Sequence, residues 1–177
     1  VRDIISVLEG DDIELLSDAE ERESEVDALL YLVERQVCVA LDSHLVATSL
    51  KIGRNQAVEH SNLAQSLERM MDHALQMAVL TRLTPKTGMK SSEPPINQII
   101  IWQKAIKQLM INIRTRDSHE IEESRVSLKQ AQNEISKYEE TLLENRKLSG
   151  EELFSFRISE SVRRLCAYAR DFGEVLL

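Results

Sequence analysis

Glycine and proline are scarce in this chain and are confined to a few places, which leaves long stretches without a break. The 177 residues include 5 glycines and 3 prolines, and all three prolines lie within 85–95. Folds made of many strands need frequent turn residues. No segment alternates polar and apolar residues over the length of a strand. The sequence therefore predicts an all-α fold built from a few long helices.

The stretches between the breaks have the apolar spacing of amphipathic helices. Asp11 with Glu14, and Ser149 with Glu152, have the spacing of a capping box, which marks a helix start. A looser segment is expected at 42–54. The predicted helices cover residues 11–41, 55–83, 96–116, 117–147 and 149–177.

The predicted helices group into two units on either side of the prolines. Val1, Ile4, Ile5 and Leu8 have the spacing of the last turns of a helix that would begin upstream. Sliding the chain along itself aligns 63–78 with 158–173 as a weak internal repeat. We therefore expect two tandem three-helix bundles of long antiparallel helices, like spectrin repeats. They would cover 1–84, with a truncated first helix, and 96–177, joined by a linker at 85–95.

Composition narrows the classes of function. A net charge of −8 argues against nucleic acid as a direct partner of this segment. No apolar run approaches the roughly 18 residues of a membrane span. Two cysteines cannot build a disulfide framework, which favours a cytoplasmic protein.

Two pairs of carboxylates are candidate metal ligands because of their spacing on the predicted helices. Glu23 and Asp27 are four residues apart, as are Glu68 and Asp72, so each pair projects from one face of its helix. If the two helices pack antiparallel, four hard oxygen ligands converge, which suits Mg, Mn or non-haem iron. His73 beside Asp72 is a further candidate. The alternative is that these are solvated acidic faces, since the chain has 30 acidic residues.

No motif of a known enzyme class is present. The chain lacks a Cys-x-x-Cys, a glycine-rich phosphate loop, a Gly-x-Ser-x-Gly and a Glu-x-x-His spacing. We therefore expect a protein that is not an enzyme. Two alternatives stay open: a metal-carboxylate bundle enzyme, and a metal-free helical scaffold that assembles complexes.

Three segments resemble the PhoU family of phosphate-uptake regulators. Residues 23–36 are similar to the family's second helix. Residues 66–74 resemble its Leu-Glu-Arg-Ile-Gly/Ala-Asp-His-Ala signature, with two methionines in place of Ile-Gly, and residues 160–171 resemble the same signature in the second repeat. The connection at 42–54 is similar to the archaeal branch of the family.

The resemblance implies two three-helix bundles in a cytoplasmic, often homodimeric protein. Such proteins are accessory regulators without catalytic turnover, which signal between a phosphate ABC transporter and a sensor kinase or transcriptional regulator. Members bind iron or zinc clusters through motifs that map here to Glu23, Asp27, Glu68 and Asp72. Archaeal relatives often carry a DNA-binding domain before the bundle. DNA binding by a longer parent chain would belong to such a domain and not to these residues.

The second repeat departs from the family pattern. Arg163 and Ala167 stand where a Glu and an Asp are expected, and the partner helix offers Gln132 and Ser136. An arginine stays protonated and does not ligate a metal. The sequence therefore predicts that the second repeat has no metal site.

Overall fold

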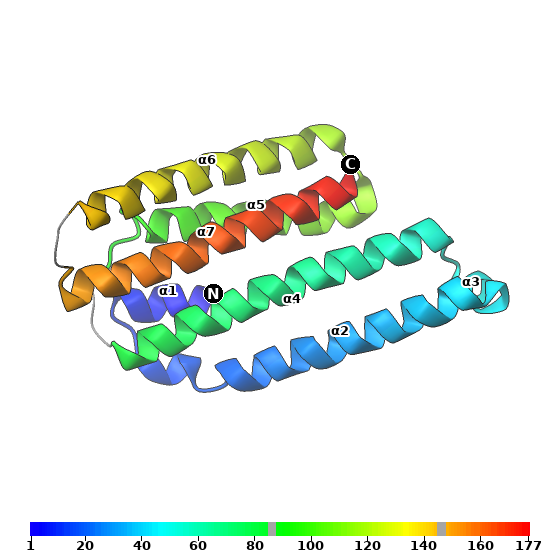
Figure 1. Ribbon diagram of the computed structural model, residues 1–177, viewed down its shortest axis with the longest axis horizontal. Helices are drawn as coiled ribbons and strands as arrows, with labels where there is room; N and C mark the ends of the chain where they lie inside the picture. Colours follow the sequence, from blue (N-terminus) through cyan, green and yellow to red (C-terminus); the bar gives the residue numbers. More distant parts are fainter. Residues whose placement is uncertain (85–87, 145–147) are drawn as a thin grey trace.

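The computed structural model describes residues 1–84, 88–144 and 148–177, which form helices joined by short connections (Figure 1). These ranges contain no strand, which confirms the predicted all-α fold. No helix in them is long and apolar enough to cross a lipid bilayer. The elements are α1 (Arg2–Glu9), the 3-10 helix η1 (Ile13–Leu16), α2 (Ala19–Asp42), α3 (His44–Leu50), α4 (Arg54–Leu83), α5 (Ile96–Thr115), α6 (Ser118–Leu143) and α7 (Gly150–Leu176).

Helix α4 is central to the packing because it contacts helices from both halves of the chain. It packs against α2 on one side and against α7 on the other, and α7 in turn contacts α5 and α6 (Figure 1). The short helix α1 packs against α4 and η1. The division into 1–84, 85–95 and 96–177 stays a prediction, and residues 85–87 of that linker lie outside the described residues.

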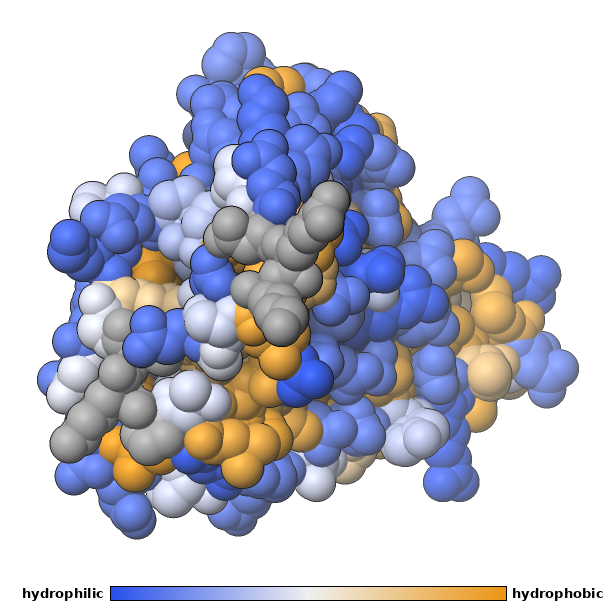
Figure 2. Space-filling model, turned by 60° about the vertical axis from the view of Figure 1, so that its left-hand side comes forward, coloured by the Kyte–Doolittle hydropathy of each residue, from blue (hydrophilic) through white to orange (hydrophobic). Residues whose placement is uncertain are grey.

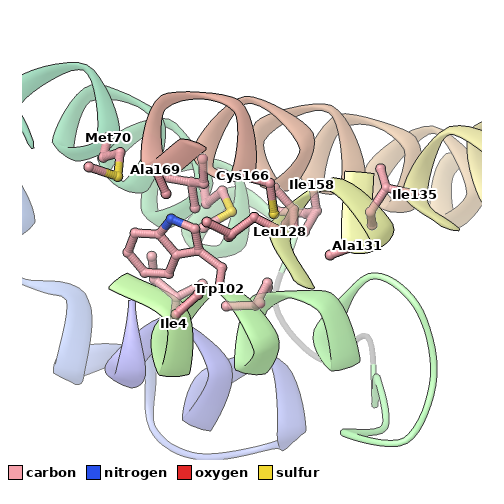
Figure 3. Packing of buried hydrophobic residues seen from close by; sticks show 14 of the residues in the cluster. Ile4, Met70, Trp102, Leu128, Ala131, Ile135, Ile158, Cys166 and Ala169 are labelled. Atoms are coloured by element: carbon pink, nitrogen blue, oxygen red, sulfur yellow. The ribbon is translucent and has the colours of Figure 1, made fainter. Parts of the chain in front are cut away.

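The hydrophobic core runs through both predicted repeats. In Figure 3 the Trp102 indole of α5 lies between Ile4 of α1 and Met70 of α4, with Ala169 and Cys166 of α7 close by. All five side chains belong to one cluster of buried residues. Burial of this shared apolar surface is the main favourable contribution to the stability of the bundle.

The predicted start of the last helix is confirmed. The Ser149 hydroxyl accepts a hydrogen bond from the Glu152 amide at 3.2 Å, and the Ser149 amide donates to Glu152 Oε2 at 2.7 Å. The predicted break near residue 117 is the start of α6, where Asp117 Oδ1 accepts from the amides of His119 and Glu120. Both caps satisfy amides that have no partner inside the helix.

The predicted helix start at Asp11 is wrong. Gly10 ends α1 with a φ of 123°, which glycine adopts without a steric penalty. Asp12 Oδ1 then accepts from the Glu14 amide at 3.0 Å and caps η1, and α2 begins only at Ala19. The tighter turn of η1 places Leu16 in the core while the chain reverses between α1 and α2. In the predicted looser segment, residues 44–50 form α3.

The apolar stripe of α2 is only partly covered. Val37 and Ala40 are buried, but Leu29 is 60% exposed, and Val26 and Leu30 are half-buried. The reason is length: α1 has 8 residues, whereas α2 has 24. Apolar side chains also reach the surface elsewhere, and Figure 2 shows such patches on one largely hydrophilic face.

Candidate metal centre

The four predicted carboxylates lie along the seam between α2 and α4. Glu23 and Asp27 project from α2, and Glu68 and Asp72 project from α4. One carboxylate oxygen each of Glu23, Asp27 and Asp72 lies within 4.8 Å of the other two. Helices α2 and α4 therefore pack antiparallel, as the sequence analysis assumed (Figure 1). This packing brings residues that are far apart in the sequence into one group.

Glu68 is adjacent to this group but is not part of it. Its side chain is half-buried, and burial, followed by the negative charges of Asp72 and Asp27, raises the pKa of the Glu68 carboxyl. The nearby charge of Arg69 opposes this shift but does not cancel it. The four side chains therefore form one region of concentrated negative charge.

Two polar links hold α2 and α4 together on either side of the carboxylates. Arg82 of α4 forms an ion pair with Glu20 of α2 near one end of the seam. Toward the other end, Gln65 Nε2 of α4 donates to Glu34 Oε1 of α2 at 3.0 Å. Both links lie outside the carboxylate group and join the same two helices.

The donor set fits a hard cation. None of the four carboxylates forms an ion pair with another described residue, and the charge of Arg69 offsets only part of the repulsion at Glu68. Oxygens within 4.8 Å of one another can be spanned by a cation whose oxygen ligands lie about 2.0–2.6 Å away. An all-carboxylate set suits Mg, Mn or iron, whereas zinc usually takes His or Cys ligands.

His73 is directed away from the carboxylates although it follows Asp72 in the sequence. Its ring stacks on Tyr168 of α7 with ring centroids 5.7 Å apart, and its Nδ1 donates to Gln76 Oε1 at 3.3 Å. Burial lowers the pKa of His73. The guanidinium of Arg69 lies over the Tyr168 ring, 5.6 Å from its centroid. His73 therefore contributes to the α4–α7 contact and not to the metal ligands.

The second half of the chain has an ion pair in place of a carboxylate group. Arg163 Nε of α7 donates to Glu139 Oε2 of α6 at 3.0 Å, and Glu139 is 9% exposed. Arg170 donates to Gln132 Oε1 at 2.8 Å. Across the described ranges no second group of three potential metal ligands occurs, and the absence of a metal site in this repeat stays a prediction. Sequence reasoning missed Glu139, although it lies three residues after Ser136 and so on the same face of α6.

Replacing Glu68 with glutamine is expected to stabilise the metal-free protein at pH 7. The raised pKa means that the folded chain binds this proton more tightly than the unfolded chain does. The stabilisation that this proton provides is complete below a pH of about 4.5, the pKa of the carboxyl in the unfolded chain. It is lost as the pH rises through the higher pKa of Glu68 in the folded chain. Because Glu68 is partly exposed, we expect a gain in Tm of about 1 °C at pH 7 and none at pH 4 or below.

Thermal unfolding with a chelator present measures this difference. The matched control is Glu25→Gln on α2, which removes an exposed carboxylate without a described partner. A Tm at pH 7 that falls in Glu68→Gln would contradict the assigned repulsion.

Part of the chain matches a known protein family. The family model described as the PhoU domain matches residues 1–81. That range holds both carboxylate pairs and spans α1 to most of α4, but it does not include residues 160–171. No curated protein and no solved structure matches the chain.

Proposed function

Because residues 1–81 of this chain belong to the PhoU domain family, we propose that it is an accessory regulator of phosphate uptake and signalling. It acts by binding other proteins in the cytoplasm and has no catalytic turnover of its own. The observation that carries the proposal is the family match, which covers the two helices that bear the carboxylate pairs.

The proposed regulator holds a metal ion at Glu23, Asp27, Glu68 and Asp72. The grouping of three of these carboxylates and the raised pKa of the fourth support this site. A bound cation would supply a positive charge that links α2 to α4. The all-oxygen donor set favours iron over zinc as the ion.

The proposed partners are components of a phosphate ABC transporter and a sensor kinase or transcriptional regulator. The net charge of −8 disfavours direct contact of this segment with nucleic acid, so control of transcription would run through a partner or a further domain. A homodimer is part of the same proposal.

One observation favours a second candidate, a metal-free scaffold with the same fold. In the second half, Arg163 pairs with Glu139 where a metal group is expected from the family pattern. A chain that has replaced one metal group by an ion pair could use the fold for assembly alone. The third candidate, a metal-carboxylate enzyme, receives less support because His73 is directed toward Tyr168.

Phosphate uptake by cells that lack this protein tests the regulatory role. We expect uptake of labelled phosphate to lose its dependence on external phosphate, and the intact gene to restore it. A variant with Asp72→Ala is expected not to restore the response. The control variant Glu25→Ala is expected to restore it, because Glu25 lies on α2 but outside the carboxylate group. Unchanged uptake in the deletion strain would contradict the proposed role.

A further inference from the structure

Arg69 is a cation close to the carboxylates that does not pair with them. It precedes Asp72 by three residues, a spacing at which an arginine and an aspartate on one helix can form an ion pair. Burial and the charges of Asp72 and Asp27 raise the pKa of Glu68, and the charge of Arg69 lowers it, so Arg69 is near enough to act on the group. No ion pair joins Arg69 to any carboxylate of the described ranges.

Tyr168 of α7 is the residue that engages Arg69 instead. The guanidinium carbon lies 5.6 Å from the centroid of the Tyr168 ring, within the range of a cation–π contact. His73, one turn after Arg69 on the same face of α4, stacks on the same ring with an angle of 24° between the ring planes. Helices α4 and α7 pack side by side here (Figure 1). The Tyr168 ring is therefore held against two side chains of α4.

We propose that Tyr168 is a positioning residue, which holds the Arg69 guanidinium over its ring and so keeps the carboxylate group open to a metal cation. Without the ring, the Arg69 side chain is free to turn toward Asp72 and pair with it. A guanidinium stays protonated, so its fixed charge would then repel and displace a divalent cation. The inference rests on the proposed function, which places a metal ion at these carboxylates.

The consequence is that a site in the first half of the chain depends on a side chain of the second half. Tyr168 lies outside residues 1–81 and offers no ligand to the group, since the grouped oxygens belong to Glu23, Asp27 and Asp72. Its effect on metal binding would therefore run through Arg69 alone.

Titration of the chelator-treated full chain with Mn²⁺ tests the proposal. We expect Tyr168→Leu, which removes the aromatic face, to bind Mn²⁺ at least about tenfold more weakly than the wild-type chain. Tyr168→Phe keeps the ring face and is expected to stay within about twofold of the wild type. Circular dichroism checks that both variants keep their helices.

A second substitution separates positioning from a general loss of packing. Adding Arg69→Gln to Tyr168→Leu removes the competing cation and is expected to restore the affinity for Mn²⁺, which a packing defect would not allow. Arg164→Gln is the matched control, with the same change in net charge. Arg164 acts on His73 at the same contact but not on Glu68, so this change should not restore the affinity.

Arg69→Gln in the wild-type background tests the proposal even where Tyr168→Leu does not fold. This variant is expected to bind Mn²⁺ at least as tightly as the wild-type chain, because Arg69 is a competitor and not a support of the site. Weaker binding by Arg69→Gln would refute the inference.

Nuclear magnetic resonance of the metal-free chain provides a readout that does not need a bound ion. The ring current of Tyr168 should shift the Arg69 Hε signal upfield in the wild type and in Tyr168→Phe, and the shift should be lost in Tyr168→Leu. An unshifted signal in the wild type would overturn the inference, whether or not the chain binds metal.

The outcomes distinguish this inference from the proposed metal site. Equal Mn²⁺ affinities of the wild type and a folded Tyr168→Leu variant would refute the role of Tyr168 and leave the metal site standing. A loss of affinity that Arg69→Gln does not reverse would refute it as well. A wild-type chain that binds no Mn²⁺ would instead remove the metal site, and with it the function proposed here for the contact between Tyr168 and Arg69.

Discussion

A chain in which Asp72 is replaced by alanine is expected to bind iron or manganese at least about 100-fold more weakly than the wild-type chain. Asp72 is the member of the grouped carboxylates that α4 supplies, and the other two, Glu23 and Asp27, come from α2. Without it the grouped donors no longer join the two helices. Elemental analysis of protein purified without an affinity tag, followed by titration of the chelator-treated protein with Mn²⁺, measures the change.

The control for this prediction is Glu25→Ala. Glu25 is an exposed carboxylate of α2 that points away from the seam by helical spacing, so the variant has the same change in net charge. It is expected to keep wild-type metal content. An Asp72→Ala protein that retains iron at wild-type stoichiometry would show that the metal, if bound, is held elsewhere. A wild-type chain that takes up no metal would favour the metal-free scaffold.

Replacing Phe172 with alanine is expected to lower the free energy of unfolding by about 3–5 kcal/mol. Phe172 of α7 is completely buried in the cluster that also contains Ile4 of α1 and Met70 of α4. Removing the ring leaves a cavity in a core shared by both predicted repeats. Because that core is continuous, the whole chain should still unfold in one transition, shifted to lower denaturant concentration.

Urea denaturation followed by circular dichroism and by Trp102 fluorescence provides the measurement. Phe156→Ala is the matched control, since Phe156 lies on the same helix and is only half-buried, and a clearly smaller loss is expected. Separate transitions seen by the two probes would mean that the two repeats unfold independently. A loss of stability below about 1 kcal/mol would contradict the role assigned to Phe172.

The identity of the helices and of the candidate ligands could be predicted because both depend on spacing within one segment. The predicted range 55–83 differs from α4 by one residue, and the capping box at Ser149 is present. Placing Glu68 four residues before Asp72 sets both on one face of any helix. The predicted start at Asp11 is wrong because the local cap at Asp12 begins the short helix η1, and α2 begins only at Ala19.

The rotation of each helix toward its neighbours could not be predicted in the same way. His73 follows Asp72 in the sequence, yet one residue corresponds to about 100° around the helix, and this directs it to Tyr168 of α7. The pairing of Arg163 with Glu139 likewise joins two helices whose relative register no local spacing reveals. A Cβ at Gly173 would lie 2.8 Å from Arg125 Cγ, so the close approach of α6 and α7 is a property of the packed bundle.

The sequence by itself determined that this chain is helical, where most of its helices end, and which carboxylates share a face. These features follow from turn residues, caps and the helical repeat, which act over a few neighbouring residues. Only the tertiary structure decided that Glu23, Asp27 and Asp72 meet, and that the apolar stripe of α2 is only partly covered. Contacts between distant segments depend on how complete helical faces pack together, and many registers satisfy the same local pattern.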